Sequence, residues 1–177
     1  MRPARQAKTV LWLMPSPNDV SIVPFRRELR EAFERLNRSW LEDHGLLEPV
    51  DLEYLQDPEG HILANGGQVL FALRDGEVVG TCAILRLSPS TVELAKLAVS
   101  PEVQGIGLGR RLCEEALAFA RELGAAEVVL TSSTLLVAAI KLYESLGFRH
   151  EPLPPDVRYA SADVYMVLRL GQADPQS

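Results

Sequence analysis

The chain has 177 residues, a formal net charge of −6 and 47% hydrophobic residues. This length is sufficient for one domain with its own hydrophobic core. Because an acidic chain binds nucleic acid and anionic membranes poorly, we expect neither as a partner.

Residues that bind metals or form disulfides are few. The two cysteines, Cys82 and Cys113, match neither a C-x-x-C motif nor a Cys/His metal pattern, and the three histidines are scattered along the chain. We therefore expect no metal site, and a protein suited to the reducing cytoplasm.

The N-terminus is basic and then apolar, which resembles the start of a signal peptide. Its apolar run at residues 10–14 is too short for that role, and prolines follow it at once. No apolar run is long enough to span a membrane. We expect residues 1–18 to form a tail or a loosely attached strand, residues 19–171 a single domain, and residues 172–177 a C-terminal tail.

The first half of the chain predicts a strand, two helical segments and a hairpin. Alternation over residues 19–25 predicts the strand, and apolar residues at helical spacing predict a helix over residues 26–45. A short helical turn is expected at residues 52–55, followed by breakers. Residues 68–87 form the clearest hairpin, because Asp75-Gly76 is a preferred two-residue turn between β-rich runs.

The second half alternates strands and helices. A strand is predicted over residues 91–101, an amphipathic helix from Leu108 to Gly124, and a strand buried on both faces over residues 126–132. A second helix is predicted from Thr134 to Leu146, with Ser133 or Thr134 as its cap. Strands at residues 147–151 and 162–170 follow. This order predicts one α/β domain with a mixed sheet and helices on its faces.

Three glycines at alternate positions, in residues 103–111, precede the first of these two helices. A P-loop would need Lys-Ser or Lys-Thr after the last glycine, but Arg110 and Arg111 stand there. A dinucleotide fingerprint has the spacing G-x-G-x-x-G and an acidic residue after the next strand, and both are missing. Two interpretations remain: a nest of backbone N–H groups for a pyrophosphate at the helix N-terminus, or a flexible connector.

The residues around these glycines resemble the GCN5-related N-acetyltransferase (GNAT) family. The segment from Gln104 to Gly109 matches the Q/R-x-x-G-x-G/A signature of the pyrophosphate loop of that family. The preceding strand "ELAKLAVSP" and the later helix "AIKLYESLGF", with its Tyr-x-x-x-Gly-Phe spacing, match as well. The likeness spans residues 68–151 in detail and the whole chain in the order of elements.

The resemblance implies a mostly antiparallel sheet, splayed between its fourth and fifth strands, and acetyl-coenzyme A as cosubstrate. Backbone N–H groups from Gly105 to Arg110 would hold the pyrophosphate. The strand at residues 97–99 would pair with the pantetheine arm and polarise the acetyl carbonyl near Leu97 or Ala98. The cofactor-binding residues so implied are Leu97, Ala98, Val99, Gln104, Gly105, Ile106, Gly107, Leu108, Gly109, Arg110 and Ser133.

Two side chains have implied roles in proton transfer. Tyr143 matches the general acid that protonates the thiolate of coenzyme A; the alternative is a core tyrosine, and the motif favours catalysis. Glu93 matches a general base; the alternative is an exposed strand glutamate beside Lys96, and the two remain equally supported. Family members often carry Asn in the turn entering the second helix, where this chain has Leu136, so Ser133 or Thr134 would replace it.

We therefore expect an N-acetyltransferase that acts on a primary amine of a small molecule or peptide, by direct attack in a ternary complex, as a monomer or homodimer. The alternative is a coenzyme A-binding regulatory or interaction module without turnover. Five acidic residues from Glu48 to Glu59 would either receive a cationic amine or form a solvated face. The loop at residues 152–161 would close over the acceptor.

Overall fold

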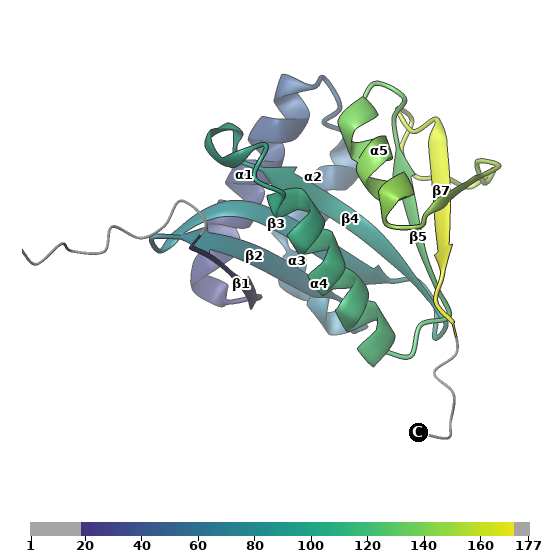
Figure 1. Ribbon diagram of the computed structural model, residues 1–177, viewed down its shortest axis with the longest axis horizontal. Coiled ribbons are helices and arrows are strands. Elements are labelled where there is room, and N and C mark those ends of the chain that lie inside the picture. Colours follow the sequence, from purple (N-terminus) through teal and green to yellow (C-terminus); the bar gives the residue numbers. More distant parts are fainter. Residues whose placement is uncertain (1–18, 172–177) are drawn as a thin grey trace, which may run out of the picture.

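A seven-stranded mixed sheet runs through the computed structural model, which describes residues 19–171 (Figure 1). The strands lie in the order β1-β2-β3-β4-β5-β7-β6, and every neighbouring pair is antiparallel except β4 and β5. The predicted fold class is confirmed. The strands are β1 Val20–Pro24, β2 Gln68–Arg74, β3 Glu77–Arg86, β4 Thr91–Val99, β5 Glu127–Ser132, β6 Arg149–Glu151 and β7 Val164–Arg169. The expected tails at residues 1–18 and 172–177 lie outside the described residues.

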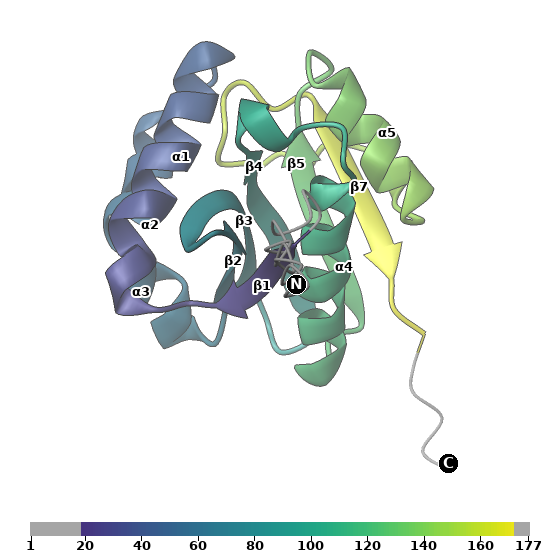
Figure 2. The same cartoon turned by 60° about the vertical axis from the view of Figure 1, so that its left-hand side comes forward.

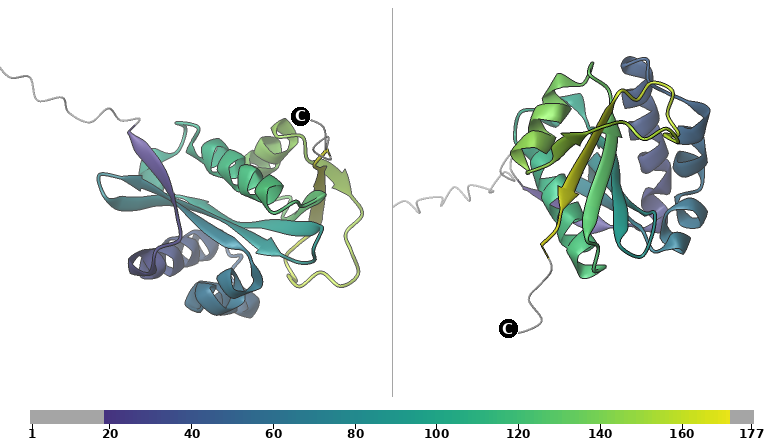
Figure 3. Two further views of the ribbon diagram at one scale, coloured as in Figure 1. Left: turned by 90° about the horizontal axis from the view of Figure 1, so that it is seen from below. Right: turned by 90° about the vertical axis from the view of Figure 1, so that its right-hand side faces the viewer.

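Helices cover both faces of the sheet, as the left view of Figure 3 shows. One face carries the first three helices and the other carries α4 and α5, so each face buries its own apolar cluster. The helices are α1 Arg30–Asp43, α2 Pro49–Gln56, α3 Pro58–His61, α4 Leu108–Glu122 and α5 Val137–Ser145. Short 3-10 turns lie at Arg27–Leu29, Leu63–Asn65 and Pro101–Val103.

The two clusters follow from the alternation of side chains along the central strands. On β3, Ala83 and Leu85 pack with Phe33 of α1, whereas Cys82 and Ile84 belong to the cluster that contains Leu112 of α4. All six residues are at most 4% exposed. The sheet is therefore buried on both faces in its middle, and it can hold a site rigidly between the layers.

The helix predicted from Thr134 begins later, at Val137, and neither predicted cap is used. The backbone N–H and the hydroxyl of Thr134 both bond to the carboxylate of Asp163, at 2.8 and 2.7 Å. The hydroxyl of Ser133 accepts a hydrogen bond from the backbone of Leu135. These contacts hold the segment as a turn, because the capping groups are already engaged.

The strands β4 and β5 separate after three paired residues. Their parallel pairing covers only Thr91–Glu93 against Glu127–Val129. Beyond Glu93, the β5-facing edge of β4 pairs with no strand within residues 19–171. Between Ala95 and Ala98, β4 also bulges away from regular pairing with β3. Lys96 lies in this bulge with φ 54°, which is unusual for a residue with a side chain. The predicted splay between the fourth and fifth strands is confirmed.

A buried chain of hydrogen bonds fixes this bulge. The hydroxyl of Thr81 donates to the carbonyl of Lys96 at 2.9 Å, and the amide of Asn37 donates to the same hydroxyl at 2.9 Å. Asn37 is 2% exposed and Thr81 is fully buried. The helix α1 is thereby tied through β3 to the irregular residue of β4.

The substitution Thr81→Val tests this chain, because valine keeps the shape of threonine and removes the hydroxyl. The amide of Asn37 and the carbonyl of Lys96 each lose a buried partner, so we expect a loss of about 1–3 kcal/mol in the free energy of unfolding. Urea denaturation measures it. Thr91→Val, at the half-buried start of β4, is the matched control with a smaller expected loss; equal losses would mean that the buried chain adds nothing.

Candidate active site

Two cavities meet where β4 and β5 diverge. The first, called here the inner pocket, has a volume of about 130 Å³ and is lined by residues of α1, α2, β4, β5, α5 and the β6–β7 loop. The second, called here the groove, has a volume of about 750 Å³ and follows the glycine-rich loop and the first turns of α4 and α5. Trp40, Leu97, Leu136 and Tyr143 line both cavities. A ligand in the groove would therefore meet a ligand in the inner pocket at these four residues.

The glycine-rich loop lines the groove beside the first turn of α4. Gly105 and Gly107 have φ of 83° and 78°, and Gly107 is the N-cap of the 15-residue helix α4. A Cβ at either position would meet no atom within 4 Å, so the loop needs glycine for its backbone conformation and not for space. Backbone N–H groups at the N-terminus of a helix in such a conformation attract anions.

Most of the predicted cofactor residues lie in the groove and three do not. The side chain of Ile106 points to solvent and is 41% exposed, and Ala98 is buried opposite Thr81 of β3. Ser133 lines the inner pocket instead. Those that line the groove are Leu97, Val99, Gln104, Gly105, Gly107, Leu108, Gly109 and Arg110.

The end of β4 turns backbone groups toward the groove. The N–H of Ser100 donates to Val79 of β3 at 2.9 Å, so the adjacent residue Val99 turns its backbone groups to the opposite edge. The carbonyl of Val99 indeed meets the side chain of Gln104, at 3.5 Å from Nε2. This open edge has the geometry to pair with an extended ligand.

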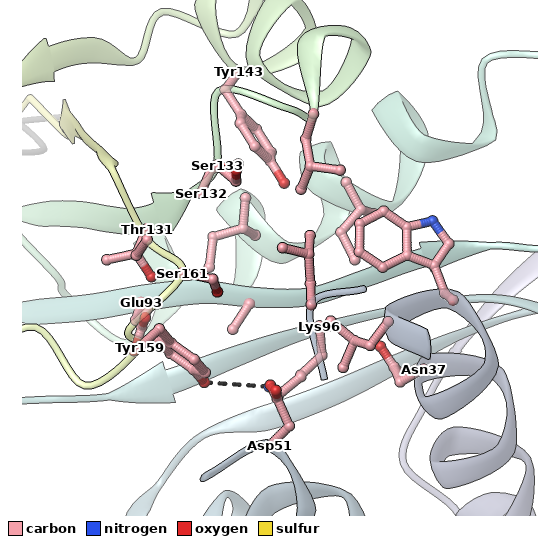
Figure 4. A pocket seen from close by; sticks show the side chains of 18 residues that line it. Asn37, Asp51, Glu93, Lys96, Thr131, Ser132, Ser133, Tyr143, Tyr159 and Ser161 are labelled. Atoms are coloured by element: carbon pink, nitrogen blue, oxygen red, sulfur yellow. Dashed lines mark hydrogen bonds and ion pairs between the residues drawn. The ribbon is translucent and has the colours of Figure 1, made fainter. Parts of the chain in front are cut away.

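Tyr143 stands between the two cavities. It lies on α5, is 9% exposed and packs edge-on against Phe148 with the ring centroids 6.0 Å apart. Its hydroxyl points into the inner pocket (Figure 4). Burial raises the pKa of the phenol well above its ordinary value, so the group is protonated at neutral pH and can donate a proton.

Glu93 lies in the wall of the inner pocket, on the last paired residue of the β4–β5 ladder. It is only 5% exposed, so the interpretation as an exposed strand glutamate is wrong. Burial raises the pKa of its carboxyl to about 7, against the opposing effect of the Lys96 ammonium. Its Oε2 also accepts from Arg158 Nη2 at 2.7 Å. A carboxyl with this pKa is suited to accept and release protons near neutrality.

Lys96 forms a buried ion pair that sequence reasoning missed. Its ammonium contacts the carboxylate of Asp51 on α2 and the hydroxyl of Tyr159, the latter at 3.2 Å (Figure 4). The side chains of Lys96 and Asp51 are 6% and 3% exposed. The one signal in the sequence is a lysine within an apolar strand, and such a charge needs a partner when it is buried.

The acidic cluster at residues 48–59 forms contacts within the protein. Asp51 pairs with Lys96, and Asp57 accepts from the backbone of Gly60 in α3. Glu59 lies beside Arg27 and Arg30. Glu48 bonds to the β6–β7 loop. Most carboxylates of this cluster therefore already have a partner within the protein. Few of its charges remain to receive a cationic amine.

Within residues 19–171 no group of three His, Cys, Asp or Glu side chains is placed to hold a metal ion. No helix of the same range combines the length and apolar character that crossing a bilayer requires.

Comparisons with known proteins agree on one family. Residues 26–148 match the model described as "Acetyltransferase (GNAT) family". The uncharacterized N-acetyltransferase YvbK of Bacillus subtilis is 28% identical over 123 residues, which cover 67% of this chain and 79% of that protein.

Solved structures share the fold. A GNAT-family acetyltransferase of Staphylococcus aureus superposes with a TM-score of 0.78 at 20% identity, covering 85% of this chain and 98% of that one. The putative acetyltransferase yncA of Salmonella typhimurium, solved with its cofactor acetyl-CoA, has a TM-score of 0.69 at 24% identity, covering 90% and 98%.

Proposed function

We propose that this chain, which belongs to the acetyltransferase (GNAT) family, transfers the acetyl group of acetyl-coenzyme A to a primary amine by direct attack in a ternary complex. Family membership makes it an acetyl-coenzyme A-dependent acyltransferase; the direct attack and the roles of its residues are the proposal. The observation that carries it is the meeting of the groove and the inner pocket at Leu97 and Tyr143. A thioester in the groove and an amine in the inner pocket would reach each other beside these two residues, which line both cavities together with Trp40 and Leu136.

The groove has features that match the pyrophosphate of coenzyme A and features that match its pantetheine arm. Backbone N–H groups from Gly105 to Arg110, at the N-terminus of α4, would hold the pyrophosphate. The open edge of β4 at residues 97–99 would pair with the amide groups of the pantetheine arm. The backbone N–H of Leu97 would then polarise the acetyl carbonyl, because Ala98 pairs with Thr81 and turns its N–H to β3. Of the predicted cofactor residues, Ala98, Ile106 and Ser133 do not line the groove.

Glu93 and Tyr143 would move the two protons of the reaction. As the amine nitrogen bonds to the acetyl carbon and the carbon–sulfur bond breaks, the carboxylate of Glu93 accepts the proton of the amine, directly or through water. The hydroxyl of Tyr143 donates its proton to the departing thiolate. Burial favours the required starting form of Tyr143, and it places the pKa of Glu93 near neutral pH.

Cofactor binding is tested with Gly107→Ala and, as its control, Gly76→Ala. Both glycines have φ near 80° and open space around a new Cβ, so the backbone strain is the same. Saturating acetyl-coenzyme A should raise the melting temperature of the wild type and the control, since a ligand that binds only the folded state stabilises it. Gly107→Ala should lose most of this rise in melting temperature. Alanine disfavours the left-handed backbone at this position, so the loop would turn its N–H groups away from the pyrophosphate. An equal rise in both variants, or a rise with NADH in place of acetyl-coenzyme A, contradicts the assigned groove.

Tyr143→Phe removes only the hydroxyl, so packing and cofactor affinity should survive. We expect the kcat of amine acetylation to fall about tenfold or more, toward the lower end of general-acid effects because a thiolate is already a good leaving group. Release of free thiol measures the rate. Tyr165→Phe on β7 is the control and should keep the wild-type kcat. Unchanged turnover in Tyr143→Phe, with chemistry rate-limiting, would make Tyr143 a core residue.

The pH dependence tests Glu93. A general base acts only in its ionised form, so kcat/KM should rise with pH through about 7, the raised pKa of its carboxyl, and fall away below it. Glu93→Gln should lower kcat/KM by about 100-fold and remove this rise. If the pH profile of Glu93→Gln keeps the same rise near pH 7, the rise belongs to another group.

The alternative function has a separate readout. If acetyl-coenzyme A binds tightly but no primary amine increases the release of thiol, the result supports a coenzyme A-binding module without turnover.

A further inference from the structure

We propose that the acceptor is a small-molecule primary amine with a partly apolar body, and not the N-terminus or a lysine of a polypeptide. This inference rests on the proposed function and names the substrate class of the same site. It follows from the loop at residues 152–163, called here the roof loop, which joins β6 to β7 and contributes Tyr159, Ser161 and Ala162 to the lining of the inner pocket. Figure 2 shows this loop beside α1.

Glu48 ties the roof loop to the connection between α1 and α2. Its carboxylate accepts from the backbone N–H groups of Ala160 and Ser161, at 2.8 and 3.3 Å, and from the Ser161 hydroxyl at 2.6 Å. Burial alone would raise the pKa of Glu48, but these hydrogen bonds outweigh it and lower the pKa. The carboxylate is therefore charged at neutral pH, which strengthens all three bonds.

Two further side chains fasten the roof loop to the floor of the inner pocket. Arg158 bonds to Glu93 on β4, lies 5.3 Å from the ring centre of Tyr54 on α2 and contacts its hydroxyl. Tyr159 accepts a hydrogen bond from Lys96. The contacts of Glu48 and Arg158 bridge the roof loop to α2 and its N-cap, and Tyr159 meets Lys96 beside Asp51, so an extended polypeptide could not enter the inner pocket between the roof loop and α2.

The size of the inner pocket agrees with a small acceptor. At about 130 Å³, it is much smaller than the groove of about 750 Å³. One water needs about 10–15 Å³ of such space, so the inner pocket admits a molecule of about ten non-hydrogen atoms.

The lining of the inner pocket indicates the character of this molecule. Trp40, Leu41, Leu46 and Leu94 form an apolar part of the wall, and hydroxyl groups of residues 131–133 form another. The charged groups are already paired, Asp51 with Lys96 and Glu93 with Arg158. Because both carboxylates that the described residues contribute to this lining already have a cationic partner, an alkyl or arylalkyl amine fits better than a polyamine.

The experiment compares three acceptor types at saturating acetyl-coenzyme A: a panel of phenethylamine, tyramine and hexylamine; spermidine; and a hexapeptide with a free N-terminus and one lysine. Thiol release and the mass of the acetylated product give kcat/KM for each. The variants are Glu48→Gln, which weakens the tether, and Glu53→Gln, which makes the same change of charge on the exposed side of α2. Melting temperatures verify that both variants are folded.

We expect at least one small amine to exceed the peptide and spermidine by about tenfold or more in kcat/KM. Glu48→Gln should reduce the discrimination against the peptide about tenfold, the effect of losing charged hydrogen bonds, while Glu53→Gln keeps it. A wild-type preference for the peptide or for spermidine overturns the inference and leaves the proposed function standing. Failure of all three acceptor types, with acetyl-coenzyme A bound, contradicts the proposed function and the inference together.

Discussion

The divergence of β4 from β5 after Glu93 is the constraint on which the rest of the structure depends. A parallel pair that ends after three residues leaves backbone groups of β4 unpaired in the middle of a buried sheet. Such groups are costly unless a ligand, water or a side chain reaches them. Both cavities open at this point, and the glycine-rich loop follows from the same strand. The open edge of β4 can therefore pair with an extended ligand that carries amide groups.

The bulge at Lys96 connects this edge to the acceptor side. Lys96 has a left-handed backbone, and its carbonyl accepts a hydrogen bond from Thr81. The ammonium of Lys96 pairs with Asp51 of α2 in the wall of the inner pocket. Asp51 also accepts from the backbone of Glu48, which holds the roof loop. One buried lysine therefore links the strand that faces the cofactor, the helix that bounds the acceptor pocket and the loop that covers it. Such an ion pair adds little net stability, so its position is of more interest than its strength.

Local signals in the sequence predicted most of the fold. Asp75-Gly76 makes the expected turn with φ of 53° and 81°, and the apolar spacing after Leu108 gives α4. What the sequence did not predict depends on partners far along the chain. The turn before α5 is held by Asp163, 29 residues after Thr134.

The site shows the same limit. Arg158 meets Glu93 across 65 residues, and Lys96 meets Asp51 across 45. The family motif located the groove and Tyr143, because these lie on contiguous segments. The charge pairing of the acceptor side arises only when α2, β4 and the roof loop pack together.

Hydrogen exchange at the end of β4 tests the central claim most directly. Amide exchange of residues 97–99 is measured with and without saturating acetyl-coenzyme A, with the antiparallel β1–β2 pair as the internal reference. If the open edge pairs with the pantetheine arm, exchange at Leu97 and Val99 slows on binding by a larger factor than any change in β1. Slowing confined to residues 105–110 would show that only the pyrophosphate is held, and it would contradict the account of the divergent strands as the cofactor site.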